Sequence, residues 1–159
     1  MLESKAAEMS ERFHDYYEKR AGKIRSRQGA RSVLEWLARK GVESIILSNH
    51  TMEGVQAQLK RLKLNGLIDE VVANPTRGIS FKRRNKLEKL EGYLKTHRCK
   101  PNEVATIGDS PEEVEIGKKA GIKTIAISQG YCSTKRLKAA KPDFLIRSLK
   151  ELPAILMRI

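Results

Sequence analysis

Two carboxylate residues, Asp109 and Glu113, follow a short apolar segment within residues 105–113, Ala-Thr-Ile-Gly-Asp-Ser-Pro-Glu-Glu. The pattern predicts a buried strand, then an acidic turn, then a helix that Ser110 caps and Pro111 begins. Open α/β sheets place their chemistry at the carboxyl ends of their strands. Two carboxylates spaced across such a turn can bind Mg²⁺ through oxygen, directly or through water. Glu113 also fits a capping box with Ser110, so both roles stay open for it, whereas Asp109 has no evident structural duty.

A second polar pair, Ser48 and Asn49, ends the apolar segment that begins at Ile45. A hydroxyl and backbone N–H groups at a strand end, just before a helix, can hold a phosphate oxygen. The alternative is that Ser48, Asn49 or Thr51 only caps the following helix. The sequence leaves both interpretations open.

Two lysines, Lys82 and Lys86, flank the start of a helix that we expect over residues 85–97. A lysine there could neutralise a phosphate and a nearby carboxylate. A solvated surface charge is the alternative.

Short apolar runs alternate with helical patterns along the rest of the chain, which predicts βαβ units and a parallel sheet. A length of 159 residues suits one compact α/β domain. We expect an N-terminal helix and linker over residues 1–28 and an α/β core over residues 29–159. The expected strands are 43–49, 70–73, 104–107, 123–127 and 143–146. The other expected helices are 29–41, 51–62 and 111–121, with a last helix that a capping box of Ser148 and Glu151 opens.

The chain carries a formal net charge of +13, spread along its length. We expect a solvated surface rather than nucleic-acid binding, because no aromatic residues are interleaved with the basic clusters for base stacking. No run of 18 apolar residues and no apolar signal core occur, so we expect no membrane segment. Cys99 and Cys132 lack metal-ligand or redox spacing, which is typical of free thiols in a reducing cytoplasm.

Taken in order, these motifs resemble the haloacid dehalogenase-like superfamily, most of whose members are Mg²⁺-dependent phosphatases. Residues 46–49 resemble its second, phosphate-binding motif, and residues 107–113 resemble its fourth, metal-binding motif. The resemblance implies a three-layer, Rossmann-like parallel sheet and hydrolysis of small phosphate monoesters. It assigns the phosphate to Ser48, Asn49 and Lys82, with Lys86 as the alternative lysine. It assigns Mg²⁺ to Asp109 and Glu113, and likens the N-terminal helix to the remnant of a helical cap.

The sequence departs from this family at the first motif, a strand ending in Asp-x-Asp-x-Thr, whose first aspartate attacks phosphorus. No such segment occurs in the 159 residues: Asp15 lies inside a helical pattern, and Asp69 follows a loop. We therefore expect a chain that is inactive alone, as a fragment or a split subunit. The family's sheet would have a gap, closed by its two neighbouring strands, by a second chain or by a homodimer. A non-catalytic module that binds a phosphorylated ligand or a protein is the alternative function, and nucleic-acid binding is the third.

Overall fold

The computed structural model describes residues 8, 11, 12, 15, 16, 19–76 and 85–159. The chain divides into two compact units. The first comprises residues 1–27 and 34–86, and the second comprises residues 28–33 and 87–159. The described residues from Glu8 to Ala21 are helical, in agreement with the helix expected there.

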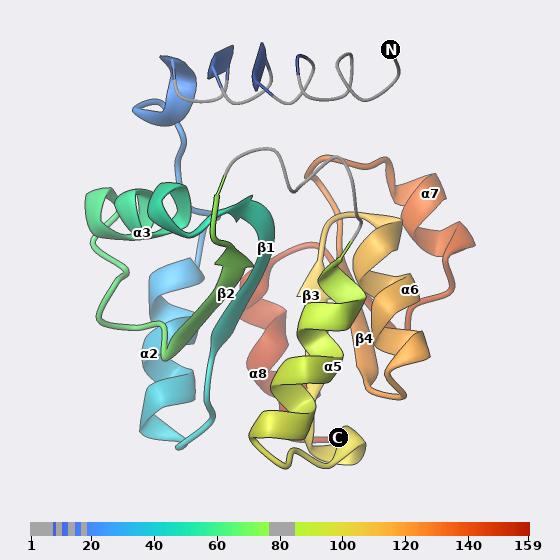
Figure 1. Ribbon diagram of the computed structural model, residues 1–159. Helices are drawn as coiled ribbons and strands as arrows, with labels where there is room; N and C mark the ends of the chain where they lie inside the picture. The colour runs from blue at the N-terminus through green and yellow to red at the C-terminus, as the bar shows by residue number, and fades with distance from the viewer. Residues whose placement is uncertain (1–7, 9–10, 13–14, 17–18, 77–84) are drawn as a thin grey trace. The chain divides into compact units, whose positions relative to one another are not determined.

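The first unit contains a parallel pair of strands, β1 (Ile45–Thr51) and β2 (Glu70–Asn74). Helix α3 (Met52–Arg61) connects them and packs against both strands (Figure 1). Helix α2 (Ala30–Arg39) precedes β1. It ends before Gly41, whose φ of +65° is a left-handed conformation that glycine adopts at low cost, as the sequence predicts.

The pairing of β1 with β2 is interrupted near the carboxyl ends of both strands. Leu47 pairs with Val72, but the next pair joins Thr51 to Asn74. Residues 48–50 therefore lie opposite a single residue of β2, and β1 bulges there. Bulges re-aim side chains and often lie beside functional sites.

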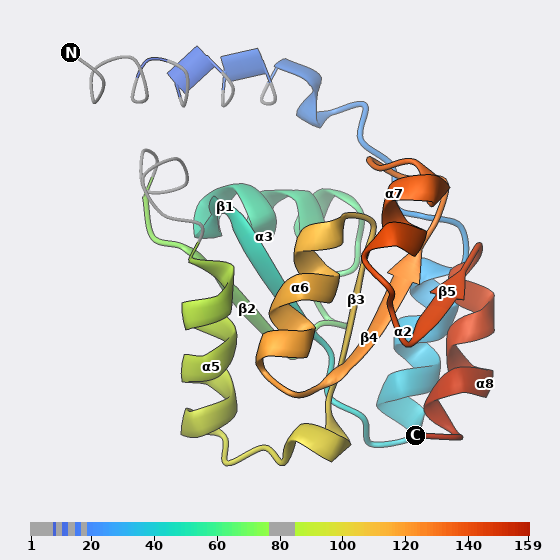
Figure 2. The same ribbon diagram turned by 90° about the vertical axis from the view of Figure 1, so that its right-hand side faces the viewer.

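The second unit contains a three-stranded parallel sheet in the order β3-β4-β5. Its elements are α5 (Lys86–Thr96, of which Lys86 belongs to the first unit), η1 (Pro101–Glu103), β3 (Ala105–Gly108), α6 (Pro111–Lys119), β4 (Lys123–Ile127), α7 (Thr134–Ala139), β5 (Phe144–Ile146), η2 (Leu149–Glu151) and α8 (Leu152–Leu156). Helix α6 lies across β3 and β4 (Figure 2). Gly117 permits this close contact, because a Cβ atom there would lie 2.6 Å from the methyl groups of Thr106 and Thr124.

The core of the second unit is built around β4, the middle strand. Four of the five residues of β4 are buried, as expected for a parallel strand covered on both faces. Its Ala126 belongs to a buried cluster with Val114 of α6, Leu137 of α7 and Cys132. This packing fixes the loop that leaves β4 at its carboxyl end.

The α/β class and the parallel strands expected from the sequence are confirmed. Two local features differ from expectation. Helix α7 was not among the expected helices, because its six residues are too few to show a helical repeat. The capping box of Ser148 and Glu151 forms, but it opens the 3₁₀ turn η2. The α-helix begins only at Leu152, where Pro153 can occupy its first turn.

Among the described residues, no helix has both the length and the apolar character needed to cross a membrane. This agrees with the sequence, which has no apolar run of that size.

Candidate functional site

Asp109 directly follows β3 and is held by the loop that follows β4. The Tyr131 backbone N–H donates a hydrogen bond to Asp109 Oδ2 at 3.2 Å, and the Cys132 N–H donates to the Asp109 carbonyl oxygen at 3.3 Å. The loop is itself anchored, since the N–H and hydroxyl of Ser128 both donate to the Ile146 carbonyl oxygen of β5. Asp109 is therefore a half-buried carboxylate with a fixed orientation at the carboxyl edge of the sheet, where the sequence places it.

Glu113 completes the capping box that the sequence suggested as one of its two roles. Its Oε2 atom accepts hydrogen bonds from the Ser110 N–H at 3.2 Å and from the Ser110 hydroxyl. The Ser110 hydroxyl oxygen accepts in turn from the Glu112 N–H, so the first turn of α6 is capped. The capping role of Glu113 is confirmed, and its role as a metal ligand stays a prediction.

Gly108, the last residue of β3, makes room for this arrangement. A Cβ atom at Gly108 would lie 2.2 Å from Glu113 Cγ and 2.7 Å from Glu113 Cβ. Real Cβ atoms do not approach other carbon atoms so closely, so glycine is required for the side chain of Glu113 to fold back over the strand end. The glycine of the Gly-Asp-Ser sequence thus has a packing role.

Ser48 and Asn49 lie in the bulge of β1. Ser48 Oγ accepts a hydrogen bond from the His50 N–H at 3.0 Å, and His50 Nδ1 accepts from the Thr51 N–H at 2.6 Å. Thr51 is the residue that caps α3, because its hydroxyl oxygen accepts from the Gly54 N–H at 3.1 Å. Of the three candidate caps, Thr51 serves, so capping does not account for Ser48 and Asn49.

The structure reveals a further residue beside this bulge that the sequence did not single out. Asn74, at the end of β2, is fully buried, with 0% of its surface exposed. Its Nδ2 donates to the Asn49 carbonyl oxygen at 2.6 Å, and its Oδ1 accepts from Asn85 Nδ2 at 3.4 Å. The only available indication was an asparagine at a strand end, which is also common in loops.

Of the two candidate lysines, Lys82 lies outside the described residues. Lys86 is the first residue of α5 and is half-buried. The structure therefore places Ser48 and Asn49 together in the bulge of β1 in the first unit, and Asp109 and Glu113 together at the turn between β3 and α6 in the second.

The described residues include no group of three or more histidine, cysteine, aspartate or glutamate side chains that could hold a metal ion. Mg²⁺ needs fewer protein ligands, because it is commonly held by one or two carboxylates together with water and phosphate oxygens. Asp109 fits that description. Glu113 fits it less well, because its Oε2 atom already accepts two hydrogen bonds within the capping box.

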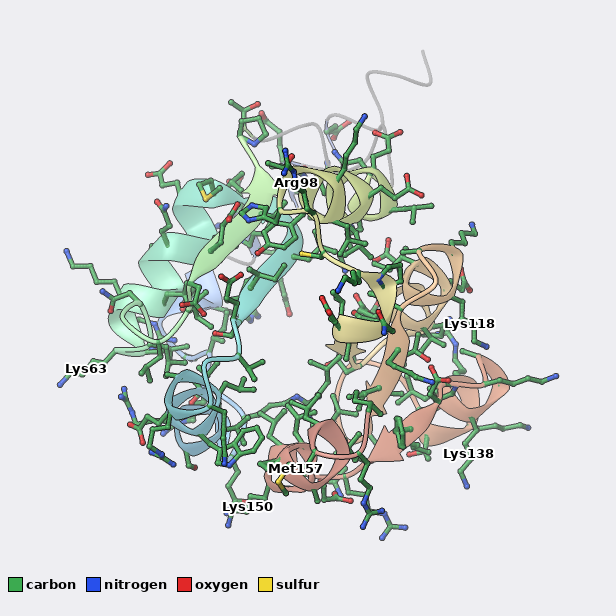
Figure 3. The ribbon with its side chains drawn as sticks, turned by 90° about the horizontal axis from the view of Figure 1, so that it is seen from below. Lys63, Arg98, Lys118, Lys138, Lys150 and Met157 are labelled. Carbon is green, nitrogen blue, oxygen red and sulfur yellow. The ribbon has the colours of Figure 1, made fainter. Side chains whose placement is uncertain are left out.

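Most basic residues in the described part of the chain are exposed. The labelled side chains of Lys63 and Lys138 point away from the protein (Figure 3), whereas Lys118 Nζ donates a hydrogen bond to the Ala140 carbonyl oxygen at 2.7 Å. This distribution agrees with the ordinary interpretation of the net charge as solvated surface.

Comparisons with known proteins agree with these motifs. The chain is 29% identical to pyrophosphatase PpaX of Bacillus mycoides over 123 residues, which are 77% of this chain and 56% of that protein. It is 27% identical to phosphoglycolate phosphatase of Pseudomonas fluorescens over 124 residues, which are 78% of this chain and 44% of that protein. The chain thus spans about half the length of these curated relatives.

Solved structures show the same fold. A haloacid dehalogenase-like hydrolase from Streptococcus pneumoniae superposes with a TM-score of 0.77 at 19% identity, covering 90% of this chain and 66% of that one. The sequence model of the haloacid dehalogenase-like hydrolases matches residues 1–127, most of the chain. The chain therefore belongs to the haloacid dehalogenase-like hydrolase family.

Proposed function

We propose that this chain supplies the phosphate-binding and metal-binding parts of a phosphatase that acts on small phosphate monoesters. The observation that carries the proposal is the placement of Asp109, a half-buried carboxylate held at the carboxyl end of β3 by the Tyr131 N–H. The relatives named as pyrophosphatase and phosphoglycolate phosphatase support a small phosphorylated substrate.

In this proposal, each turn has its own task. The bulge of β1 offers the hydroxyl of Ser48 and the backbone of Asn49 to the phosphate oxygens, and Lys82, or else Lys86, balances their charge. Asp109, with Glu113 in support, would hold Mg²⁺, whose positive charge would offset the negative charge of the phosphate. These residues bind and orient the phosphate, which is a large part of catalysis in phosphoryl transfer.

The attacking carboxylate is not part of this set, because no Asp-x-Asp-x-Thr segment occurs in the 159 residues. We therefore propose that the chain alone binds phosphate without turnover, and that a strand carrying this motif completes the site.

The partial exposure of strands β1 and β3 supports this proposal. Apart from Thr51, β1 is only partly buried, and Ile107 of the edge strand β3 is 37% exposed. Parallel strands are normally buried on both faces, and an edge strand presents unpaired backbone groups to a further strand.

A different second chain would supply that strand. A homodimer would fill the gap in the sheet but would bring no attacking carboxylate, because each copy lacks the motif. A cytoplasmic location belongs to the same proposal. A non-catalytic binding module is the second candidate function, because the same lack of an Asp-x-Asp-x-Thr segment also fits a chain that binds without ever turning over. Nucleic-acid binding remains the third and least favoured function.

Calorimetric titration of the purified chain with Mg²⁺ and with inorganic phosphate tests the binding part. We expect Asp109→Asn to weaken Mg²⁺ binding and Ser48→Ala to weaken phosphate binding, each by at least about tenfold, or ~1.4 kcal/mol. Asp143→Asn is the matched control, because Asp143 precedes its strand rather than following it and should leave both affinities unchanged. Equal Mg²⁺ affinities for the wild type and Asp109→Asn would contradict the assignment.

Hydrolysis of p-nitrophenyl phosphate tests the catalytic part. The chain alone should show no Mg²⁺-dependent turnover, and a peptide with an apolar strand ending in Asp-x-Asp-x-Thr should restore it. Turnover by the pure chain would refute the need for a supplied nucleophile. Phosphate binding that no added strand converts into hydrolysis would favour the non-catalytic alternative.

A further inference from the structure

Asn74 is a fully buried polar side chain at the carboxyl end of β2. Burying an amide is costly unless its donor and acceptor groups find partners. Both groups of Asn74 do, one on Asn49 in the bulge of β1 and the other on Asn85, the residue before α5. A buried asparagine with two long-range partners therefore connects three segments of the first unit.

The direction of these hydrogen bonds is fixed by their first partner. A backbone carbonyl oxygen only accepts, so the Asn74 atom at 2.6 Å from the Asn49 oxygen must be the Nδ2 donor. The Oδ1 atom of Asn74 then faces Asn85, which must present its own NH₂ group. Only an amide satisfies both contacts, since a carboxylate at position 74 would turn an oxygen toward the Asn49 carbonyl.

The bond to Asn49 matters because of where it is made. Residues 48–50 have left the regular pairing with β2, and a bulge leaves backbone groups without their usual ladder partners. Asn74 bonds the Asn49 carbonyl oxygen, and so restrains the peptide that joins Asn49 to His50. The N–H of that same peptide donates to Ser48 Oγ, so the restraint reaches the Ser48 hydroxyl in the predicted phosphate turn, the bulge of residues 48–50.

We infer that Asn74 is the positioning residue of the phosphate turn. It would not touch the phosphate. It holds the Asn49 carbonyl so that the Ser48 hydroxyl and the N–H groups of the turn keep one orientation, and through Asn85 it ties that turn to the start of α5, next to Lys86. The inference rests on the proposed function for its ligand, but the restraint on the turn can be measured without any ligand.

Two substitutions separate positioning from simple loss of packing. Asn74→Asp keeps the shape and the acceptor toward Asn85 but removes the donor toward Asn49. Asn74→Leu has a similar volume and removes both bonds. Thr124→Val is the matched control: Thr124 is also fully buried, and its hydroxyl hydrogen-bonds to Asp143 in the second unit. All three variants should lose stability, so stability alone does not decide the inference.

The deciding measurement is amide hydrogen exchange at His50 and Thr51, whose N–H groups donate to Ser48 Oγ and His50 Nδ1. We expect both Asn74 variants to speed this exchange at least about tenfold, the change produced by ~1.4 kcal/mol of lost local stability. Thr124→Val should leave the exchange rates of the His50 and Thr51 amides unchanged, once the contribution of global unfolding is subtracted for each variant. Unchanged exchange in both Asn74 variants would overturn the inference.

The same proteins are then titrated with inorganic phosphate under conditions in which each is folded. Removing a residue that orients a metal ligand typically lowers metal affinity by about 10- to 100-fold. For a residue that orients a phosphate-binding group we expect a similar effect, a loss of phosphate affinity of about tenfold in both Asn74 variants. Faster exchange with unchanged phosphate affinity would overturn the positioning role and leave a structural one. If the wild type binds no phosphate, the proposed function fails, and the exchange data still decide whether Asn74 restrains the turn.

Discussion

Replacement of Gly108 by alanine should destabilise the fold through a specific collision. The added Cβ atom would lie 2.2, 2.7 and 2.8 Å from Glu113 Cγ, Cβ and Cδ. Glu113 cannot withdraw without giving up the hydrogen bonds that its carboxylate accepts from Ser110. The substitution therefore removes a helix cap as well as crowding the strand end.

The sign of the effect distinguishes this argument from the ordinary behaviour of glycine. Where backbone and space permit, Gly→Ala stabilises by about 0.4–1 kcal/mol because it restricts the unfolded chain. Gly108 has no positive φ, so the backbone alone would permit alanine. Against this gain stand a lost cap, worth about 1 kcal/mol, and overpacking, worth about 1–3 kcal/mol. The net loss is about 2 kcal/mol, which lowers the melting temperature by roughly 4–8 °C in a domain of this size.

Thermal unfolding followed by circular dichroism measures this effect, with Gly92→Ala as the matched control. Gly92 lies within α5, and a Cβ atom there would meet nothing within 4 Å, so this alanine should stabilise by about 0.8–1 kcal/mol. In a Glu113→Ala background, Gly108→Ala should cost less, because only the 2.7 Å contact with Cβ remains. A Gly108→Ala protein that melts at or above the wild-type temperature would refute the reasoning.

Two further predictions concern the second unit. The hydroxyl and the N–H of Thr124 donate to Asp143 and lower the pKa of its carboxyl below the usual 3.8, so the charged form is favoured in the folded state. The contribution of Asp143 to stability is thus present above pH 3.8 and is lost as the pH falls below it. Between about pH 5 and about pH 2, the melting temperature should depend less on pH in Asp143→Asn than in the wild type. An equal dependence of melting temperature on pH in both proteins would contradict the assignment. Leu137→Ala should cost about 2–5 kcal/mol in urea unfolding, because the Leu137 side chain is completely buried in the core cluster, and a loss below about 1 kcal/mol would mean that the cluster closes around the cavity.

The strands and most helices could be predicted from sequence because each carries its own local signal. Ile125 lies in an apolar run too short for a helix. The start of α6 is indicated by three residues within four positions, Ser110, Pro111 and Glu113. Asp109 could be placed at a strand end for the same reason. Helix α7 could not be predicted, because its short span includes a single buried apolar residue, Leu137.

The supporting contacts of the candidate site were beyond the sequence for a different reason. Asn74 finds its partner Asn49 across 25 residues, and Asp109 receives the Tyr131 N–H across 22. Such contacts depend on strand pairing, register and loop path, none of which leaves a pattern in neighbouring residues. The same holds for Gly108: the sequence shows the glycine, but only the structure shows that the Glu113 side chain packs against it.

The hydrogen bond between the Tyr131 amide and Asp109 has a practical consequence. An amide proton shared with a carboxylate changes its NMR frequency when that carboxylate gains a proton or a metal ion. The Tyr131 resonance is thus a built-in reporter on Asp109, read from the main chain without altering the carboxylate. Because Tyr131 is 87% exposed, isotopic labelling of its side chain leaves the contact of its amide with Asp109 in place. Binding of a metal ion at Asp109 could thus be followed without any measurement of enzymatic turnover.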